Sequence, residues 1–481
     1  MSADLNLDYS LLIPEFLLAG LAAALIGLDL FVPRFRKEWL PHLTVGGLLV
    51  ALGVSLAWVD RYSNFAGIIY VDNYTTFFRV FFTGTAAAIA LASAQFVRGR
   101  VRHPGEYYGL IVLSTIGAIY MAASRELLSA YISLELLSFS LYVLVSITRD
   151  DLRSSEGGMK YMLLGAFSSA LFLYGMSLIY GLAGSTYYAE ISAALSADPA
   201  GFHFGLIVAL VLIVTGLGFK VAAVPFHMWT PDAYEGAPMP VTAYLSATSK
   251  AAGFAFILRF FAAGLLPVID DWDWMIAGLS AATIVLGNLV ALQQKNIKRL
   301  LAYSSISQVG YMLMGIAALT PVTASAIVLH MTGYVITNVA AFTVIIAWHV
   351  ITEREDIADF RGMAERAPLM AAVLAGALFS LAGMPLFAGF LTKFVLFQAT
   401  AEEGFLWLAV IGIVMSVVSL YYYLQVIKQL YIVEPEAPGR VAVPLSVNGL
   451  AAGLAIAMMY VGLYPRHLFE LVENATSFLF V

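Results

Sequence analysis

Residues 217–229 read LGFKVAAVPFHMW, an apolar run that contains a lysine, Lys220, and, five residues later, a proline, Pro225. A lysine at the centre of a bilayer costs roughly 3 kcal/mol, and a proline removes a backbone donor and disrupts a helix. Lipid cannot hydrogen-bond the freed backbone groups, so such a break must lie within protein or beside water. The stretch therefore predicts a broken membrane helix that holds a charge beside its break.

Composition extends this interpretation to the whole chain. Of 481 residues, 61% are hydrophobic and only 12% are charged, against about 25% charged in a typical soluble domain. Apolar runs of roughly 18–25 residues recur from end to end, and each is long enough to cross a bilayer as a helix. Strands of a membrane barrel would instead alternate apolar and polar positions. We expect an all-α integral membrane protein with about fourteen transmembrane helices. The expected spans are 10–32, 41–59, 75–97, 108–123, 126–147, 160–183, 204–229, 239–263, 273–292, 299–320, 324–350, 368–396, 405–432 and 444–465.

The distribution of basic residues predicts the orientation of these spans. The loops between consecutive spans are numbered in chain order. Most arginines and lysines of these loops lie in the odd-numbered loops, whereas the even-numbered loops and their borders have Arg61, Arg79, Arg125 and Arg466. Cytoplasmic loops carry the excess of Lys and Arg. We therefore expect the odd loops in the cytoplasm and both termini on the outer, periplasmic side of a bacterial plasma (inner) membrane. The acidic N-terminus lacks the basic start of a signal peptide.

A second interrupted span indicates an internal repeat. The twelfth span contains LAGMPLFAGF, with Gly383 and Pro385 at its break and Lys393 nearby, as Pro225 has Lys220 nearby. Paired broken helices in two halves of a chain are typical of transporters built from repeats. We expect helices 1–3 in residues 1–107, five-helix repeats in 108–263 and 264–432, and helix 14 in 433–481. The weak match of ELLSFSLY (135–142) to SSISQVGY (304–311) supports this division.

The chain has no cysteine, which excludes disulfides, iron–sulfur clusters and thiolate zinc sites within it. It also has no dinucleotide fingerprint, phosphate-binding glycine loop or metal-ligand cluster. We expect no redox centre, metal or cofactor in this chain, and no nucleic-acid partner.

A few charged residues within apolar spans carry the functional information. Glu135 is the clearest acid in mid-span, and Lys220 is its candidate partner on a neighbouring helix. One carboxylate cannot neutralise Lys220, Lys250 and Lys393 together. Desolvation favours the neutral form of an unpaired lysine, and such a lysine can exchange a proton, which arginine cannot. These four residues are therefore interpreted as a proton relay, with structural ion pairing as the alternative.

Three further polar positions are weaker candidates. Lys160 opens the sixth span, where extension of its amine to the membrane interface would explain it equally well. His227 follows the break at Pro225 and is assigned to a proton path or gate, although a lone histidine can be a satisfied core residue. His330, in the eleventh span, has no helix break beside it in the sequence, so a proton-path role and a core role are equally open. Arg259, toward the far end of its span, is expected to anchor the helix.

Three longer stretches resemble a known family. They are PFHMWTPDAYEGAPMPVTAYLS (225–246), LLAYSSISQVGYM (300–312) and LAGMPLFAGFLTKF (381–394). They look like the antiporter-like membrane subunits of the proton-translocating NADH–quinone oxidoreductase, respiratory complex I, and the resemblance covers essentially the whole chain. Ser246 stands where the L and M subunits and cation/proton antiporters typically have a histidine, so the chain resembles the N subunits most.

The resemblance implies a function and roles for single residues. It implies a subunit of the translocase that pumps protons through Glu135, Lys220, Lys250 and Lys393, with NADH, FMN, iron–sulfur clusters and quinone bound by partner subunits. It also implies neighbouring membrane subunits as partners. Gln308 departs from the family, many members of which have histidine there, so a water would have to carry that step. A subunit of a multisubunit cation/proton antiporter, or of a ferredoxin-dependent relative, remains the alternative.

Overall fold

The computed structural model describes residues 7–31, 34–197, 203–436 and 439–480 as one elongated helical bundle. Within these residues, thirteen helices are long and apolar enough to cross a membrane. One of them, Ala388–Tyr431, joins two helices across a reversal at Gly404, whose φ of +92° favours glycine. Dividing it there, and joining α16 (Pro368–Ala382) to the part before Gly404 across the break at Gly383, gives fourteen spans near the predicted positions. The predicted end of the first span, residue 32, lies outside the described residues.

The bounds of the helices follow in chain order. The N-terminal group is α1 (Ile13–Phe31), α2 (Leu40–Ser55) and α3 (Asn73–Arg100). The next group is α4 (Pro104–Ala123), α5 (Leu127–Val145), α6 (Leu152–Ala183), α7 (Tyr188–Ala197), α8 (His203–Val221), α9 (Trp229–Gly236), α10 (Met239–Tyr244) and α11 (Lys250–Phe260). The third group is α12 (Asp273–Ala291), α13 (Ile297–Ala317), α14 (Pro321–Thr352), α15 (Met363–Arg366), α16 (Pro368–Ala382), α17 (Ala388–Thr400) and α18 (Leu406–Tyr431). The chain ends with α19 (Leu445–Leu463) and α20 (Arg466–Ser477).

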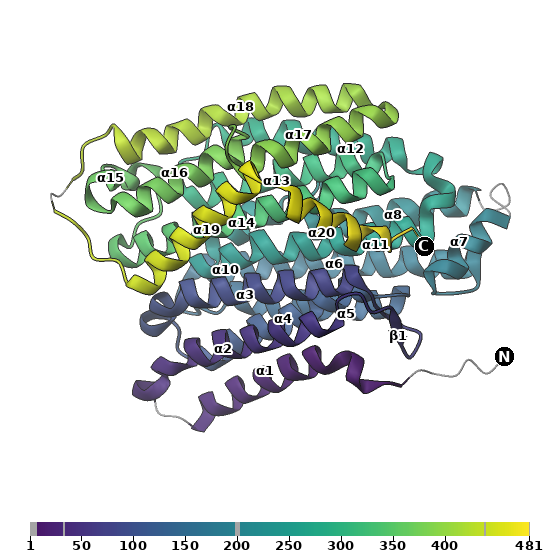
Figure 1. The fold of residues 1–481 in the computed structure, drawn as a ribbon, viewed down its shortest axis with the longest axis horizontal. Coiled ribbons are helices and arrows are strands. Elements are labelled where there is room, and N and C mark those ends of the chain that lie inside the picture. Colours follow the sequence, from purple (N-terminus) through teal and green to yellow (C-terminus); the bar gives the residue numbers. More distant parts are fainter. Residues whose placement is uncertain (1–6, 32–33, 198–202, 437–438, 481) are drawn as a thin grey trace.

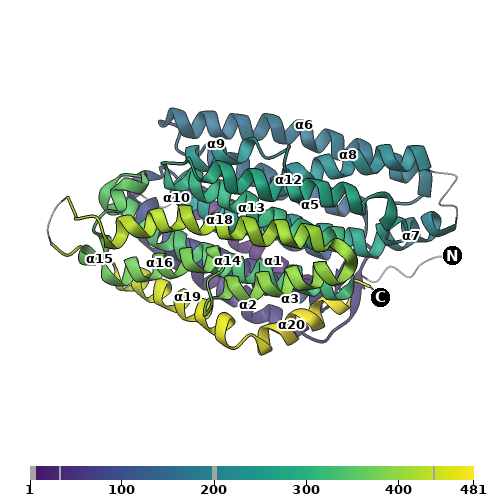
Figure 2. The same cartoon turned by 90° about the horizontal axis from the view of Figure 1, so that it is seen from above.

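Most helices run along the long axis of the bundle (Figure 1). Helices α1 and α2 form one flank, and α17 and α18 form the opposite one. Helices α13 and α14 lie in the centre, and nearly all their side chains are buried. Seen from above, α6 and α8 lie along one edge and α19 and α20 along the other (Figure 2). The axis of the bundle is thus the direction in which its spans cross a membrane.

Both predicted helix breaks are present. Helix α8 ends at Val221, before Pro225, and the chain turns at Ala222, whose φ is +66°. The break releases backbone carbonyls, and the Trp229 indole donates to the Phe219 oxygen at 2.9 Å. Helix α16 ends at Ala382 with Gly383 as its left-handed cap. The first break is buried at Ala222 and Ala223, whereas Met384 and Leu386 at the second break are exposed on the surface of this chain.

Several local expectations are wrong. The segment after His227, predicted as loop, forms α9, which packs between α6 and α13. The sixth span begins at Leu152, so Lys160 lies two turns inside α6 and does not open it. Residues Leu245–Ser249, just before Lys250, are π-helical, a widening that pattern alone does not reveal.

Smaller elements at one end of the bundle were not predicted. They are a hairpin of β1 (Ser63–Phe65) and β2 (Ile69–Val71), helix α7, and the amphipathic α20. The Asn73 amide donates to the Asn474 side-chain oxygen at 2.6 Å, and the Tyr62 ring stacks on Phe478. Tyr9 also contacts the hairpin through Phe65. The first described residues and the end of α20 therefore meet at the same end of the bundle.

Candidate functional site

Lys220 occupies the last turn of α8, where the helix stops at the break. Its side chain is 3% exposed, and its Nζ donates to the Ser138 hydroxyl of α5 at 2.9 Å. A cation at a helix C-terminus is favoured by the unpaired carbonyls there. The break thus holds a buried ammonium against a neutral oxygen.

Glu135 lies one turn before Ser138, on the same face of α5. The Ser169 hydroxyl of α6 donates to its Oε1 at 2.5 Å. Within the described chain Glu135 and Lys220 form no ion pair within 4.0 Å, although the Glu135 charge acts on the lysine. Lys220 donates to Ser138 instead, so the acid and the hydroxyl that accepts from the amine lie on the same face of α5.

Lys250 lies at the start of α11, directly after the π-helical turn. It is 1% exposed, and its Nζ donates to the Ser305 hydroxyl of α13 at 2.5 Å. The amine also lies 5.6 Å from the centroid of the Tyr234 ring of α9, a cation–π distance. Among the described residues no carboxylate lies within 4.0 Å of it.

A chain of polar side chains leads through the centre of the bundle toward Lys393. The His330 Nε2 of α14 lies 3.2 Å from the Gln308 Oε1 of α13, and its Nδ1 lies 3.0 Å from the Thr392 hydroxyl of α17. An amide oxygen can only accept, so Nε2 donates, and a neutral ring then accepts from Thr392 at Nδ1. Gln308 and His330, predicted separately, form one unit.

Lys393 is 4% exposed and follows Thr392 directly. Its Nζ donates to the Leu381 carbonyl at 2.6 Å and to the Ser416 hydroxyl at 3.1 Å. Leu381 lies in the last turn of α16, so the second break supplies the acceptor, as the ends of helices leave carbonyls free. The amine lies 5.0 Å from the centroid of the Tyr311 ring and lines an open cavity of about 370 Å³ between α17 and α18.

Lys160 and His227 lie outside this line of contacts. Lys160 pairs with Glu156 and Asp232, each at 2.8 Å, and Asp232 also pairs with Arg299 at 3.0 Å. Burial alone would raise the pKa of Asp232, but its hydrogen bonds to Lys160 and Arg299 lower it below its usual value. The cluster joins α6, α9 and α13. His227 Nδ1 is buried and has no hydrogen-bond partner among the described residues.

Two arginines that were assigned to span ends are buried structural groups. Arg259, expected to anchor its helix, is 1% exposed and binds both Asp72 oxygens. Arg79, counted with the even-numbered loops, lies inside α3 and donates to Glu15 at 2.6 Å. Burial alone would raise the pKa of Asp72, but the Arg259 charge holds it below its usual value. Both arginines are fully matched by acids, unlike the three lysines.

Sequence reasoning missed the oxygens that receive the lysines, Ser138, Ser305 and Ser416, as well as Thr392 and a further buried lysine, Lys298. Serine in a membrane helix usually bonds its own backbone, as Ser138 also does to Leu134. The sequence therefore does not show which serines accept a hydrogen bond from a lysine of the relay. Within the described residues, no group of three or more His, Asp or Glu side chains could hold a metal ion.

The comparisons with known proteins match this architecture. Residues 124–419 match the family described as NADH:quinone oxidoreductase/Mrp antiporter, TM. The chain is 41% identical over 477 residues to NADH-quinone oxidoreductase subunit N of Moorella thermoacetica, covering 98% of this chain and 99% of that one. A chain of respiratory complex I from Thermus thermophilus superposes with a TM-score of 0.80 at 32% identity, covering 96% and 100%. A chain of the Mrp complex from Dietzia gives 0.87 at 22% identity, covering 98% and 97%, which shows a shared fold.

Proposed function

Because this chain belongs to the NADH:quinone oxidoreductase/Mrp antiporter transmembrane family, we propose that its buried lysines relay protons across the membrane. The chain is a proton-translocating membrane subunit, of the N type, of NADH-quinone oxidoreductase. It is a multi-pass integral membrane protein, and its partners are the other membrane subunits of that complex. Electron transfer takes place in partner subunits, which hold NADH, FMN, iron–sulfur clusters and quinone.

The relay runs from Glu135 through Lys220 and Lys250 to Lys393. One observation supports it most strongly: each of the three lysines is less than 5% exposed, and each donates to a neutral oxygen rather than to a carboxylate. An acceptor without charge does not hold the amine in its charged form. Each amine can therefore alternate between ammonium and amine as the charges around it change.

His330 and Gln308 bridge the interval between Lys250 and Lys393. His330 accepts and releases the proton, and Gln308, which does not titrate, orients the ring through its oxygen. Lys160 and His227 are secondary groups of the proton path in the first half: Lys160 pairs with Asp232 of α9, and His227 lies at the break that follows α8.

The energies are sufficient for such a relay. Moving one charge against 100 mV costs about 2.3 kcal/mol. Two unit charges about 10 Å apart interact by roughly 1.7 kcal/mol at an effective dielectric constant of about 20. Quinone reduction elsewhere in the complex changes the charge at one end of the axis. Each lysine then changes the proton affinity of the next by an amount comparable to the cost of pumping.

The proposed orientation places the odd-numbered loops in the cytoplasm and both termini on the periplasmic side of the bacterial inner membrane. The rule for basic residues supports it, and so does the meeting of Tyr9 and α20 at one end.

We also propose that 108–263 and 264–432 are the two repeats. A Cβ at Gly117 of α4 would lie 2.7 Å from the Leu137 nitrogen of α5, and one at Gly287 of α12 would lie 2.7 Å from the Ser307 nitrogen of α13. The two glycines are 170 positions apart in the sequence, and so are the two residues that they contact. This spacing supports the equivalence of the pair α4–α5 with the pair α12–α13, each with a glycine where its two helices come closest.

The test replaces Lys220 in the intact complex and measures NADH-driven proton translocation in inverted membrane vesicles. Lys220→Met should abolish most of it, and so should Lys220→Arg, since arginine keeps the charge but cannot release its proton. Lys428→Met, at an exposed lysine of α18, serves as the matched control and should leave it unchanged. Pumping and quinone reduction that persist in both Lys220 variants would refute the relay. Co-purification of flavin and iron–sulfur subunits separates this function from that of a cation/proton antiporter or a ferredoxin-dependent relative.

A further inference from the structure

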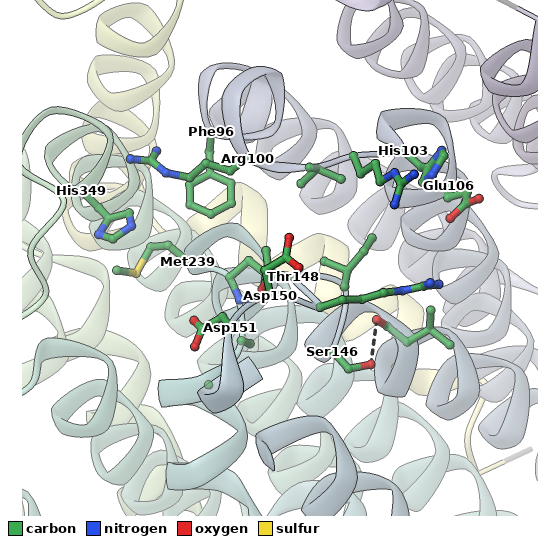
Figure 3. A pocket seen from close by; sticks show the side chains of 18 of the residues that line it. Phe96, Arg100, His103, Glu106, Ser146, Thr148, Asp150, Asp151, Met239 and His349 are labelled. Carbon is green, nitrogen blue, oxygen red and sulfur yellow. Dashed lines mark hydrogen bonds between the residues drawn. The ribbon is translucent and has the colours of Figure 1, made fainter. Parts of the chain in front are cut away.

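A polar cavity of about 630 Å³ opens at the end of the bundle where the odd-numbered loops meet. Its walls come from the connections α3–α4, α5–α6 and α9–α10, from the start of α13, and from the end of α14. Figure 3 shows His349 and Met239 on one side, His103 and Glu106 on the other, and Asp150 and Asp151 between them. The proposed function places this end in the cytoplasm.

Lys298 lies at the inner wall of this cavity. Its side chain is 4% exposed, and its Nζ lies 2.9 Å from Glu355 Oε1 and 3.2 Å from the Ala237 carbonyl. Two backbone hydrogen bonds, from Ile297 to the Glu355 oxygen and from Ile357 to the Lys295 oxygen, fix the loop that presents the carboxylate. Backbone hydrogen bonds therefore fix the position of Glu355, and the Ala237 carbonyl fixes the position of the Lys298 amine.

Glu355 and His349 connect Lys298 with the water of the cavity. Their side chains are 23% and 14% exposed, against 4% for the side chain of Lys298, so both reach solvent more than the lysine does. His349 Nδ1 lies 3.9 Å from Glu355 Oε1 and 3.2 Å from the Arg354 carbonyl. A proton that reaches Glu355 from solvent is one short transfer from Lys298, and a proton that reaches His349 gets there through Glu355.

Lys298 also lies on the same face of α13 as a residue of the relay. Ser305, which receives Lys250, lies seven residues further along the same helix, hence on the same face and about 10.5 Å away. The last part of α9 spans the same interval: Lys298 bonds its C-cap residue, Ala237, and Lys250 lies over the ring of Tyr234.

Buried hydroxyl groups border this interval. Those of Tyr234 and Thr230 on α9, and of Thr248 and Ser249 in the π-helical turn before Lys250, make no hydrogen bond within 3.5 Å among the described residues. Tyr234 nevertheless lies near Ser305, Ser249 near Tyr161 and Thr248 near Tyr244. Buried polar groups in native proteins are bonded to protein or to ordered water. Together with Ser305, these hydroxyls give the interval between the cavity and Lys250 a polar lining that bound water can follow.

We propose that Lys298, Glu355 and His349 form the cytoplasmic proton-uptake group that feeds Lys250. The Lys298 ammonium releases its proton inward to water along this polar lining, which leaves the amine beside the Glu355 carboxylate. The carboxylate then takes up a proton from cavity water or from protonated His349 and passes it to the amine. One proton thus enters for each that leaves, and the ion pair is restored. The other titratable and charged groups facing the cavity are Arg100, Arg102, His103, Glu106, Arg149, Asp150 and Asp151. Asp151 and Glu235 of α9 also act on the charge of Lys298, together with Glu355.

This inference rests on the proposed relay, so the experiment tests the two separately. The rate of NADH-driven proton pumping is measured in inverted vesicles across a series of medium pH values, together with the amount of assembled complex. Lys298→Arg keeps the pair with Glu355 but cannot release a proton. Glu355→Gln removes the group that reloads it. Asp150→Asn removes a carboxylate from the exposed part of the same cavity and is the matched control.

Both Lys298→Arg and Glu355→Gln should lower proton capture on the order of tenfold. The pH above which pumping declines should therefore fall by about one unit, while Asp150→Asn leaves it in place. A wild-type profile in both test variants, with pumping lost in Lys250→Met, would overturn the uptake group alone. Normal pumping in Lys250→Met would refute the relay itself. A wild-type profile in Lys298→Arg together with loss of assembly in Glu355→Gln would identify a purely structural pair and also overturn the proposal.

A second measurement covers variants that fail to assemble. The chain has no cysteine, so Thr148→Cys places a single thiol in the cavity. A bulky, membrane-impermeant thiol reagent should then slow pumping, and the unsubstituted chain, treated in the same way, corrects for thiols in partner subunits. Unchanged pumping after complete labelling would contradict uptake through this cavity.

Discussion

The buried ion pair of Arg259 and Asp72 allows the cost of removing one charge to be predicted. Its two charges neutralise each other, whereas the lysines of the relay have no carboxylate partner in the described part of the chain. Arg259 joins α11 to the start of α3. It donates to both Asp72 oxygens, to Thr75 at 3.1 Å and to the Ala122 carbonyl at 3.1 Å, and it lies 4.6 Å from the centroid of the Tyr74 ring. The substitution Arg259→Met removes all of these contacts and leaves the Asp72 carboxylate, 1% exposed, without its cation.

The expected cost follows from the unpaired charge. Removing one member of a buried ion pair destabilises a protein by about 3–5 kcal/mol, whereas replacing both members is often near neutral. We expect Arg259→Met to cost about 4 kcal/mol and the double substitution with Asp72→Asn to cost at least about 2 kcal/mol less. Arg259→Lys should recover little, since an ammonium cannot bind both oxygens and Thr75 in the same geometry.

The assay is the stability of the purified complex in detergent, measured by thermal unfolding of single and double variants and completed as a double-mutant cycle. Proton pumping per NADH oxidised, measured on the assembled fraction, should stay normal in the double variant, because Asp72 and Arg259 do not belong to the relay. A double variant that is as stable as the wild type but does not pump would refute this separation of structural from relay charges. Equal instability of the single and double variants would refute the reasoning from the unpaired carboxylate.

Three other expectations concern the relay and its surroundings. His330→Gln should lower proton pumping on the order of tenfold while the complex still assembles, and adding Gln308→His should restore part of it; vesicle assays with both variants decide this. The contribution of Asp232 to stability should be constant near neutral pH, because its folded pKa is lowered: the stabilisation is complete above the unfolded value of 3.8 and is lost as the pH falls through the lower folded value. Acid unfolding of wild type and Asp232→Asn, compared over that window, tests it. Single cysteines at Asp150 and Tyr62 should be labelled by an impermeant reagent from the cytoplasmic and the periplasmic side respectively; the reverse result would invert the proposed topology.

The order of the spans could be predicted because it depends on local chemistry. A run of about 20 apolar residues has few alternatives to a membrane helix, and proline or glycine beside a lysine marks a break wherever the chain folds. Lys220 with Pro225 and Lys393 with Gly383 were identified in this way. Details governed by contacts between distant segments were not. The helix α9, the π-helical turn before Lys250 and the amphipathic α20 depend on neighbours that a local pattern does not specify.

The sequence by itself determined the membrane class, the number of spans and the residues that carry charge into the bilayer, because the cost of burying a charge is a property of the residue type. Only the tertiary structure decided which of these charges are matched. It brought Arg259 to Asp72 and Arg79 to Glu15, but it brought Lys220, Lys250 and Lys393 to hydroxyl and carbonyl oxygens. That difference separates a structural ion pair from a group that can exchange a proton. It arises from packing between helices far apart in the chain, which no local pattern records.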